Sequence, residues 1–190
     1  MRESARFFGS FLAHPLQVGA LVPTSRRTVR RMLDMAEISA ARAVAEFGAG
    51  TGVFTSEILK RAGPEAQVLA FEIDPVLASN LSARFEDRRL RVIHDTVERV
   101  EDYLDGAEVD VIVSSLPFTS MPKQVRRAIL ERAARILRPR GVMLVIQYST
   151  LLQGDLRRNF ASVARCVSLV NVPPAFLFAC RGPLEGTSGS

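Results

Sequence analysis

The sequence contains few of the side chains that bind metals or form disulfides. It has two cysteines, Cys166 and Cys180, and two distant histidines, His14 and His94, and no cysteines are spaced as CxxC. Such a set does not suit a tetrahedral zinc site, so we expect no metal. Both cysteines lie in apolar segments typical of strands. We therefore expect two reduced, buried thiols, with a disulfide as the alternative.

Long hydrophobic runs are absent as well. No uninterrupted apolar stretch approaches the roughly 20 residues that span a bilayer. The N-terminal "FFGSFLAH" is short, has charged residues beside it and is followed by proline instead of a small-residue cleavage site, which is unlike a signal peptide. We therefore expect a cytoplasmic protein. Hydrophobic residues make up 47% of the 190, which is enough for one domain with a sizeable core.

Positive charge exceeds negative charge, giving a net charge of +5, and the excess is unevenly distributed. Residues 1–40 carry six arginines against three acidic residues: Arg2, Arg6, Arg26, Arg27, Arg30 and Arg31. A second basic run lies further along the chain: Lys123, Arg126, Arg127, Arg132, Arg135, Arg138 and Arg140. Basic faces suit anionic partners such as nucleic acid or acidic lipid. For the second run, a solvated helix face is the alternative.

Strand and helix patterns alternate from residue 41 onward. Seven apolar segments are predicted as strands: 41–47, 67–73, 90–95, 109–117, 141–148, 163–172 and 175–180. Three segments are predicted as helices: 54–62, 75–85 and the strongly amphipathic 123–137. This alternation predicts an α/β fold with a parallel sheet covered on both faces. The last two strands meet across a tight turn at Pro173 and Pro174, so we expect them to pair antiparallel.

A glycine motif follows the first predicted strand. In "AEFGAGTG", residues 45–52, Gly48, Gly50 and Gly52 form GxGxG, which differs from the GxGxxG of dinucleotide-binding folds. Glycine lets the backbone turn sharply and lets a ligand approach it closely. The motif predicts a ligand-binding loop, and a purely structural turn is the alternative.

Acidic residues end the next two predicted strands. Glu72 stands 20 residues after Gly52, where a carboxylate can accept hydrogen bonds from both ribose hydroxyls. Asp95 ends the following strand, where it can read an adenine amino group. Strand ends meet at one edge of a parallel sheet, so we expect one cofactor site there, and we include Ile73, Thr96 and Ser114 in it. Simple helix caps are the alternative for the two acids.

The glycine loop is not suited to a pyrophosphate, because it contains no lysine and the chain has no P-loop. Glu46 instead suits a ligand that carries positive charge. S-adenosylmethionine is such a ligand, since it has a sulfonium and an α-amine.

"SSLPF", residues 114–118, ends the fourth predicted strand beside this pocket. It looks like the (N/D)PP(Y/F) motif of amino-methyltransferases, in which a side-chain oxygen and a backbone carbonyl accept hydrogen bonds from the nitrogen to be methylated. Here Ser115 stands at the Asn/Asp position, Leu116 supplies the carbonyl and Phe118 is the aromatic residue. A plain strand-terminating proline is the alternative.

Together these motifs are similar to those of the ribosomal RNA adenine dimethyltransferases. The chain more closely resembles the bacterial phospholipid N-methyltransferases, which convert phosphatidylethanolamine to phosphatidylcholine. That resemblance covers nearly the whole chain and includes "HPLQVGALVPTS", "VAEFGAGTG", "FEIDP", "SSLPF", "VIQYS" and "VNVPPAF". The first and last of these are the more specific. The segment "VIQYST" departs from the pattern because it lacks a second aromatic residue after Tyr148.

The resemblance implies a Rossmann-like seven-stranded methyltransferase sheet in residues 41–182. An N-terminal segment, 1–40, would supply an amphipathic helix, a cover loop and a basic helix, and the Gly/Ser-rich 183–190 would be disordered. Gly19, Thr24 and Ser25 would belong to the cofactor site, and Thr24 or Ser25 would also cap the basic helix.

The resemblance also implies S-adenosylmethionine as cofactor, S-adenosylhomocysteine as product, and a phospholipid amine as substrate. Ser115, Leu116 and Tyr148 would act on that amine, with Tyr148 or Phe118 holding the methylated cation by cation–π attraction. The N-terminal arginines and the aromatic residues before the loop, Phe7, Phe8 and Phe11, would dock the protein on an anionic membrane at its inner face, with packing of these aromatic residues on the core as the alternative. No nucleic acid partner is expected. Methylation of RNA adenine, or cofactor binding without catalysis, are the alternatives.

Overall fold

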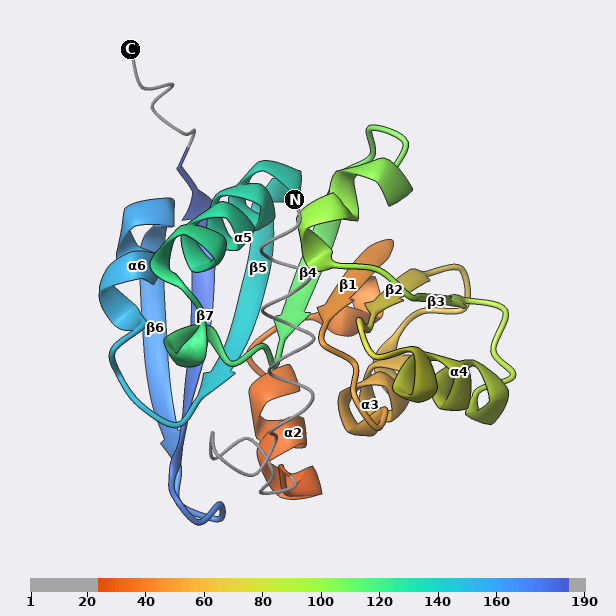
Figure 1. Ribbon diagram of the computed structural model, residues 1–190, viewed down its shortest axis with the longest axis horizontal. Coiled ribbons are helices and arrows are strands. Elements are labelled where there is room, and N and C mark those ends of the chain that lie inside the picture. The colour runs from red at the N-terminus through yellow and green to blue at the C-terminus, as the bar shows by residue number, and fades with distance from the viewer. Residues whose placement is uncertain (1–23, 185–190) are drawn as a thin grey trace.

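The computed structural model describes residues 24–184 as a single seven-stranded sheet with helices on both faces (Figure 1). The strands are β1 (Ala43–Phe47), β2 (Gln67–Phe71), β3 (Leu90–Ile93), β4 (Val109–Ser114), β5 (Leu137–Gln147), β6 (Phe160–Ser168) and β7 (Ala175–Pro183). The α-helices are α2 (Arg26–Leu33), α3 (Val53–Arg61), α4 (Pro75–Arg84), α5 (Lys123–Ile136) and α6 (Gln153–Asn159). Predictions for residues 1–23, including Gly19, the amphipathic helix and most of the cover loop, lie outside the described residues, as does the predicted disordered tail from residue 185 onward. The predicted start of that tail is wrong, because Pro183 is the last residue of β7 and the Leu184 N–H donates to the Asn159 carbonyl.

The strand order is β3-β2-β1-β4-β5-β7-β6. Strands β1 to β5 are parallel, and β7 runs antiparallel to both β5 and β6. The predicted Rossmann-like seven-stranded sheet is therefore confirmed. Because Phe47 pairs with both Phe71 and Ser114, the carboxyl ends of β2, β1 and β4 lie next to one another.

Alternation along the strands divides the core between the two faces of the sheet. Val44 packs with Val29 of α2 and Ile58 of α3 on one face. Phe47 packs on the other face with residues of α5 and α6, such as Ile129. Helix α2 is therefore joined to the sheet by buried side chains.

Two helix starts follow directly from the sequence. Ser25 caps α2, since its Oγ accepts a hydrogen bond from the Thr28 N–H, as predicted for Thr24 or Ser25. Asp74 caps α4 by accepting from the N–H groups of Val76 and Leu77, and Pro75 occupies the first helical position. The "EIDP" sequence thus ends a strand and starts a helix within four residues.

The predicted strand boundaries differ from the observed ones, most of all at β5, which begins at Leu137 and not at residue 141, and at β6, and one α-helix was missed. Strand β6 begins at Phe160 and ends at Ser168, whereas 163–172 was predicted, so the apolar residues after Ser168 belong to the hairpin tip. Helix α6 has seven residues with Leu156 as its one buried side chain, which leaves no apolar period to detect. Ion pairs from Arg126 and Arg158 to Asp155 help to hold it in place.

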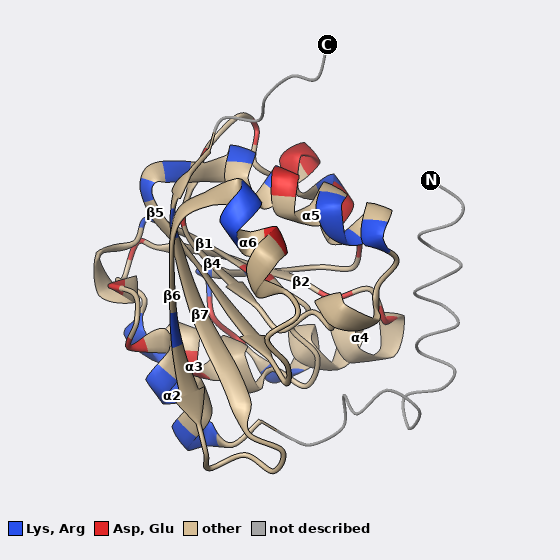
Figure 2. Cartoon of the chain, turned by 90° about the vertical axis from the view of Figure 1, so that its left-hand side faces the viewer, with Lys and Arg blue, Asp and Glu red and all other residues tan. Residues whose placement is uncertain are grey.

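The second basic run lies mostly on α5 and at the start of β5, and much of its charge is paired. Arg126 contacts Asp155, Arg127 contacts Glu131, and Arg138 contacts Asp110. Figure 2 shows basic residues on α5 with acidic residues nearby. These contacts favour the interpretation of this run as a solvated helix face.

Both cysteines are free, and Cys180 is buried in β7, whereas Cys166 is only half-buried in β6. Burial raises the pKa of the Cys180 thiol to about 12. Within residues 24–184 no helix is long and apolar enough to cross a membrane. In the same range no group of three His, Cys, Asp or Glu side chains could hold a metal ion.

Candidate active site

The glycine loop leaves β1 in left-handed backbone conformations. The φ angles of Gly48, Gly50 and Gly52 are 79°, 54° and 80°. A side chain at Gly52 would meet Leu81 at 2.6 Å, whereas one at Gly50 would meet no atom of the described residues within 4 Å. Gly52 is therefore required by packing within the protein, and Gly50 leaves open space where a ligand can approach the backbone.

Glu72 fastens this loop to the end of β2. One carboxylate oxygen accepts from the Gly50 N–H at 2.7 Å, and the other accepts from the Asp74 N–H at 2.9 Å. Each oxygen has a further lone pair, so Glu72 can still accept from ribose hydroxyls. Glu72 thus has a structural role that the sequence did not show, beside the cofactor role that it predicted.

Glu46 is a buried carboxyl group near the loop. Its Oε2 accepts from the Thr55 hydroxyl at 2.7 Å, and its Oε1 has no hydrogen-bond partner among residues 24–184. Burial raises the pKa of Glu46 to about 7, and repulsion from Glu72 adds to this effect. A cation placed beside the unpartnered oxygen would favour the ionised form.

The Glu46 carboxyl should make stability depend on pH. Its pKa in the folded protein is about 7 and its ordinary value is 4.5. A raised pKa gives stability that is complete below the ordinary value and lost as pH rises through the folded value. We expect the free energy of unfolding to fall by roughly 3 kcal/mol as pH rises from about 4.5 to about 7. Glu46→Gln should remove this fall.

Urea unfolding of both proteins across that range measures the effect. Parallel pH profiles for the two proteins would show that Glu46 does not change its protonation there.

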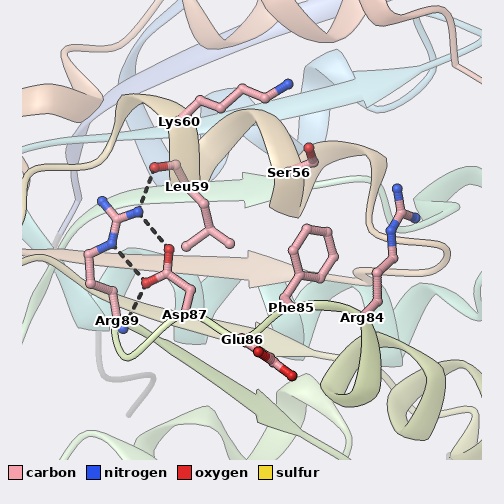
Figure 3. A pocket seen from close by; sticks show the side chains of 8 residues that line it. All are labelled: Ser56, Leu59, Lys60, Arg84, Phe85, Glu86, Asp87 and Arg89. Carbon is pink, nitrogen blue, oxygen red and sulfur yellow. Dashed lines mark hydrogen bonds and ion pairs between the residues drawn. The ribbon is translucent and has the colours of Figure 1, made fainter.

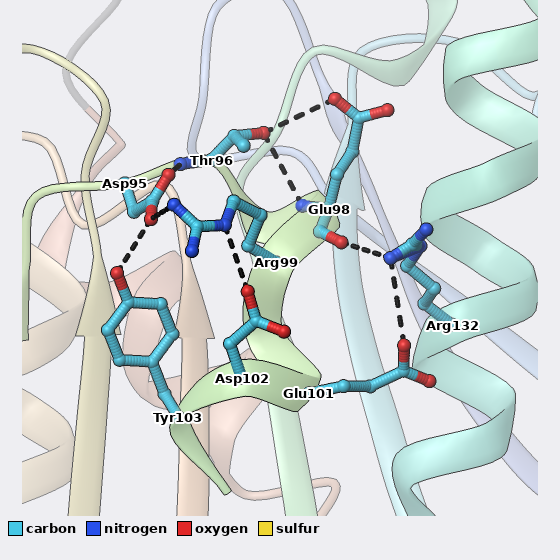
Figure 4. Close-up of polar contacts among 8 residues, drawn as sticks. All are labelled: Asp95, Thr96, Glu98, Arg99, Glu101, Asp102, Tyr103 and Arg132. Atoms are coloured by element: carbon cyan, nitrogen blue, oxygen red, sulfur yellow. Dashed lines mark hydrogen bonds and ion pairs between the residues drawn. The ribbon is translucent and has the colours of Figure 1, made fainter. Parts of the chain in front are cut away.

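Asp95 follows β3, as predicted, but its oxygens already have partners (Figure 4). Oδ1 accepts from the Thr96 N–H, while Oδ2 accepts from the Tyr103 hydroxyl at 2.6 Å and from Arg99 at 3.0 Å. Thr96 caps the short helix Val97–Tyr103. Recognition of an adenine amino group by Asp95 stays a prediction, and it requires Asp95 to accept a further hydrogen bond or exchange one.

Ile73, the remaining residue assigned to the cofactor site, follows Glu72. It is half-buried and packs against the core cluster that contains Phe71.

The "SSLPF" segment lies against the glycine loop. The Ser115 hydroxyl donates to the Gly48 carbonyl at 2.7 Å, and the Leu116 side chain would lie 3.0 Å from a side chain at Gly48. Ser114, at the end of β4, is buried, and its Oγ accepts from the Leu116 N–H. The two motifs that the sequence assigned to cofactor and acceptor are thus in direct contact.

The Leu116 carbonyl, predicted to hold the amine, accepts two hydrogen bonds in this structure. One comes from the Phe118 N–H at 2.9 Å and the other from Gln147 Nε2 at 2.8 Å. The Ser115 oxygen, which donates its proton to Gly48, keeps lone pairs for an amine. Ser115 is therefore the better placed acceptor, and Leu116 must release a partner to take part.

Tyr148 follows β5 and is only half-buried. Its hydroxyl lies 3.5 Å from Thr24 Oγ1 and 3.5 Å from Asn171 Nδ2. Phe118 is fully buried in the core, so of the two predicted cation-binding rings only Tyr148 is accessible.

Two buried polar residues at this edge were not predicted. Gln147 donates to the Leu116 carbonyl, and Asn171 joins the hairpin to α2. A polar residue inside the apolar run "VIQY" was the available signal for Gln147.

A hollow of about 420 Å³ lies between α3 and the segment after α4 (Figure 3), and no predicted site residue lines it. Arg89 forms an ion pair with Asp87 there, at 2.7 Å, which lowers the pKa of Asp87 to about 2. Arg89 also donates to the carbonyls of Leu59 and Ala62 at the end of α3. Arg89 thus joins the segment after α4 to the end of α3, and we interpret the hollow as part of the packing between these two segments.

The geometry at the strand edge fits S-adenosylmethionine. Gly50 leaves an open approach, Glu72 offers carboxylate oxygens for ribose, and Glu46 has an unpartnered buried oxygen that suits a cation.

Comparison with known proteins identifies the family of the chain. A family model described as a methyltransferase domain matches residues 44–141, which include the glycine loop, Glu72, Asp95 and Ser115. The chain therefore belongs to the class I S-adenosylmethionine-dependent methyltransferases. Its cofactor is S-adenosylmethionine.

One relative matches along the whole chain. The ornithine lipid N-methyltransferase of Singulisphaera acidiphila is 32% identical over 190 residues, which cover 97% of this chain and 99% of that protein. A ribosomal RNA small subunit methyltransferase A of Dehalococcoides mccartyi is 28% identical over 128 residues, and the match covers 65% of this chain but 41% of that protein.

Among solved structures, the 1,6-didemethyltoxoflavin-N1-methyltransferase of Burkholderia thailandensis, with bound 1,6-didemethyltoxoflavin and S-adenosylhomocysteine, has the same fold. Its TM-score is 0.71 at 20% identity, with 96% of this chain and 90% of that chain covered.

Proposed function

We propose that this methyltransferase methylates the headgroup amine of a membrane lipid, and that phosphatidylethanolamine and its mono- and dimethyl forms are its substrates. The observation that carries the proposal is the full-length similarity to a lipid N-methyltransferase. In this proposal the protein works in the cytoplasm, bound peripherally to the inner face of the cell membrane. The sequence resemblance to phospholipid N-methyltransferases supports phosphatidylethanolamine.

The cofactor supplies the methyl group, and the chain must hold the amine. The ordinary pKa of a primary amine is about 10, so it must lose a proton before it can react. The Ser115 oxygen can accept a hydrogen bond from the neutral amine, and the Leu116 carbonyl can do so after releasing Phe118 or Gln147. Such alignment of the nitrogen supplies much of the rate of a transfer reaction.

Ornithine lipid is a second candidate, because the relative that matches the whole chain is named for it. Incubation with methyl-labelled cofactor and vesicles of either lipid, followed by lipid separation, tests both. Total RNA forms a third arm. Label in RNA alone would overturn the proposal, and label in ornithine lipid alone would replace phosphatidylethanolamine as the substrate.

Removing the Ser115 hydroxyl should slow turnover. We expect Ser115→Ala to lower kcat by about three- to tenfold, as for the loss of one hydrogen bond, with a smaller change in cofactor affinity. Steady-state kinetics on lipid vesicles and calorimetry with the cofactor measure the two effects. Ser115→Thr keeps the hydroxyl and should retain more activity. An equal loss in both variants would argue against a role for this oxygen.

Removing the Tyr148 ring should affect the later methylation steps most. Cation–π attraction is worth about 0.5–2 kcal/mol, and it grows in importance as the amine gains a permanent charge. We expect Tyr148→Leu to accumulate partly methylated lipid, whereas Tyr148→Phe keeps the ring and should behave like the unmodified protein. Chromatography of the three methylated lipids gives the result, and uniform slowing of all steps by the Leu variant would contradict it.

A further inference from the structure

The tip of the β6–β7 hairpin, residues 169–174, is apolar and exposed. Leu169 is 76% exposed, Val170 49% and Val172 80%, and the tip sequence "LVNVPP" contains no charged residue. Of the six exposed large hydrophobic side chains in the described part of the chain, three lie in this tip. Such clustering marks an interaction surface, whereas single exposed aliphatic residues are ordinary.

The tip is firmly tied to the start of α2. Asn171, between the exposed valines, is buried and accepts from the Thr28 hydroxyl at 2.5 Å and from the Ser25 hydroxyl at 3.2 Å. The Thr28 hydroxyl also lies 2.7 Å from the Ser168 hydroxyl, at the end of β6. The exposure of the aliphatic side chains therefore occurs in a segment held by buried hydrogen bonds.

Arginines flank this apolar tip. Arg26 and Arg27 are exposed in the first turn of α2, directly after Ser25, and that turn contains no acidic residue. Figure 2 shows the basic residues of α2 beside the uncharged hairpin tip. Positive charge at a helix N-terminus opposes the helix dipole, so these arginines do not serve the stability of α2. They suit an anionic partner instead.

The same tip lies beside the candidate acceptor site. Asn171 Nδ2 is 3.5 Å from the hydroxyl of Tyr148, which follows β5 at the strand edge. A surface that binds the hairpin tip therefore lies close to the strand edge that carries Tyr148.

We propose that the hairpin tip and the first turn of α2 form a docking surface for an anionic lipid bilayer, with Leu169, Val170 and Val172 entering the headgroup boundary and Arg26 and Arg27 facing acidic headgroups. The inference rests on the proposed function, because a lipid amine reaches the site only if the strand edge lies on the membrane. It adds the hairpin tip to the membrane docking that the sequence predicts for the N-terminal arginines, two of which are Arg26 and Arg27. Aliphatic side chains with adjacent cations have the composition of an interfacial segment.

The test is sedimentation of the full chain with phosphatidylcholine vesicles, with and without phosphatidylglycerol. We expect the double variant Leu169→Ser/Val172→Ser to lower partitioning onto acidic vesicles by about tenfold for each side chain. Val76→Ser/Leu184→Ser makes the same chemical change at exposed sites away from the tip and should bind like the unmodified protein. Calorimetry with the cofactor verifies that each variant is folded.

A second pair of variants tests the charge. Arg26→Gln/Arg27→Gln should weaken binding to acidic vesicles and leave binding to phosphatidylcholine unchanged. Arg88→Gln/Arg140→Gln removes the same charge at exposed positions elsewhere and should have little effect.

The outcomes separate docking from catalysis. If the Leu169→Ser/Val172→Ser variant sediments with acidic vesicles as well as its control, the docking surface is wrong, even if the protein methylates phosphatidylethanolamine. If the tip variants lose vesicle binding but the unmodified protein methylates neither lipid amine, docking holds and the proposed function fails. If ultracentrifugation without lipid shows that the tip variant only dissociates a dimer, the tip is an interface between copies and the proposal is overturned.

Discussion

Replacing Gly50 with alanine is expected to leave the protein folded and to weaken S-adenosylmethionine binding by about tenfold or more, and valine should abolish binding. The φ of Gly50 is 54°, which costs an L-residue roughly 1–2 kcal/mol. No atom of residues 24–184 lies within 4 Å of the added carbon, so the packing of this part of the chain does not oppose the change. We expect the cofactor to approach through this open space, which the new side chain would occupy.

Gly52→Ala is the matched control, because the same change should there disrupt folding. The added carbon would lie 2.6 Å from Leu81 and 2.8 Å from Phe85. Overpacking of this kind costs about 1–3 kcal/mol, beyond the cost of its positive φ. Melting temperature and calorimetric cofactor affinity are measured on both variants. We expect Gly50→Ala to lose mainly affinity, and Gly52→Ala to lose mainly melting temperature. Full cofactor affinity in the Gly50 variant would mean that the loop is only a structural turn.

Replacing Glu72 with alanine is expected to weaken cofactor binding by roughly 1.5–3 kcal/mol, the range for a hydrogen bond to a charged group. It also removes the acceptor for the N–H groups of Gly50 and Asp74, so the loop loses its attachment to β2. Both effects act in the same direction.

Glu72→Gln distinguishes the two effects. The amide keeps one acceptor oxygen, which can serve the Gly50 N–H, but its NH2 group then faces the Asp74 N–H, and the charge is lost. We expect its melting temperature to lie between those of the Glu72→Ala variant and the unmodified protein, while its cofactor affinity falls, as measured by calorimetry. Unchanged affinity in a folded Glu72→Ala protein would remove Glu72 from the site.

The strand ends of the candidate site could be predicted from the sequence because they depend on local chemistry. Glycines after a buried strand and an acid at the next strand end are recognisable without knowing what packs on them. Asp74 and Pro75 likewise define the start of α4 within a few residues.

The partners of these groups depend on tertiary packing, which the sequence does not display. Asp95 was correctly placed after β3, but its bonds to Arg99 and Tyr103 depend on how the following short helix turns back. The second hydrogen bond to the Leu116 carbonyl comes from Gln147, which lies 31 residues away on the neighbouring strand.

The order of the strands has a consequence for how the chain reaches its native state. Strands β6 and β7 form a hairpin, and β5 pairs with β7 across α6 and β6, whereas β1 pairs with β4 across a longer stretch of chain. Closing a longer loop costs more entropy, so we expect the strands of residues 137–183 to pair before β1 pairs with β4. The contact of the glycine loop with Ser115 forms only in that later step. Because S-adenosylmethionine binds only the complete site, it stabilises the native protein but not the folding intermediate that precedes it.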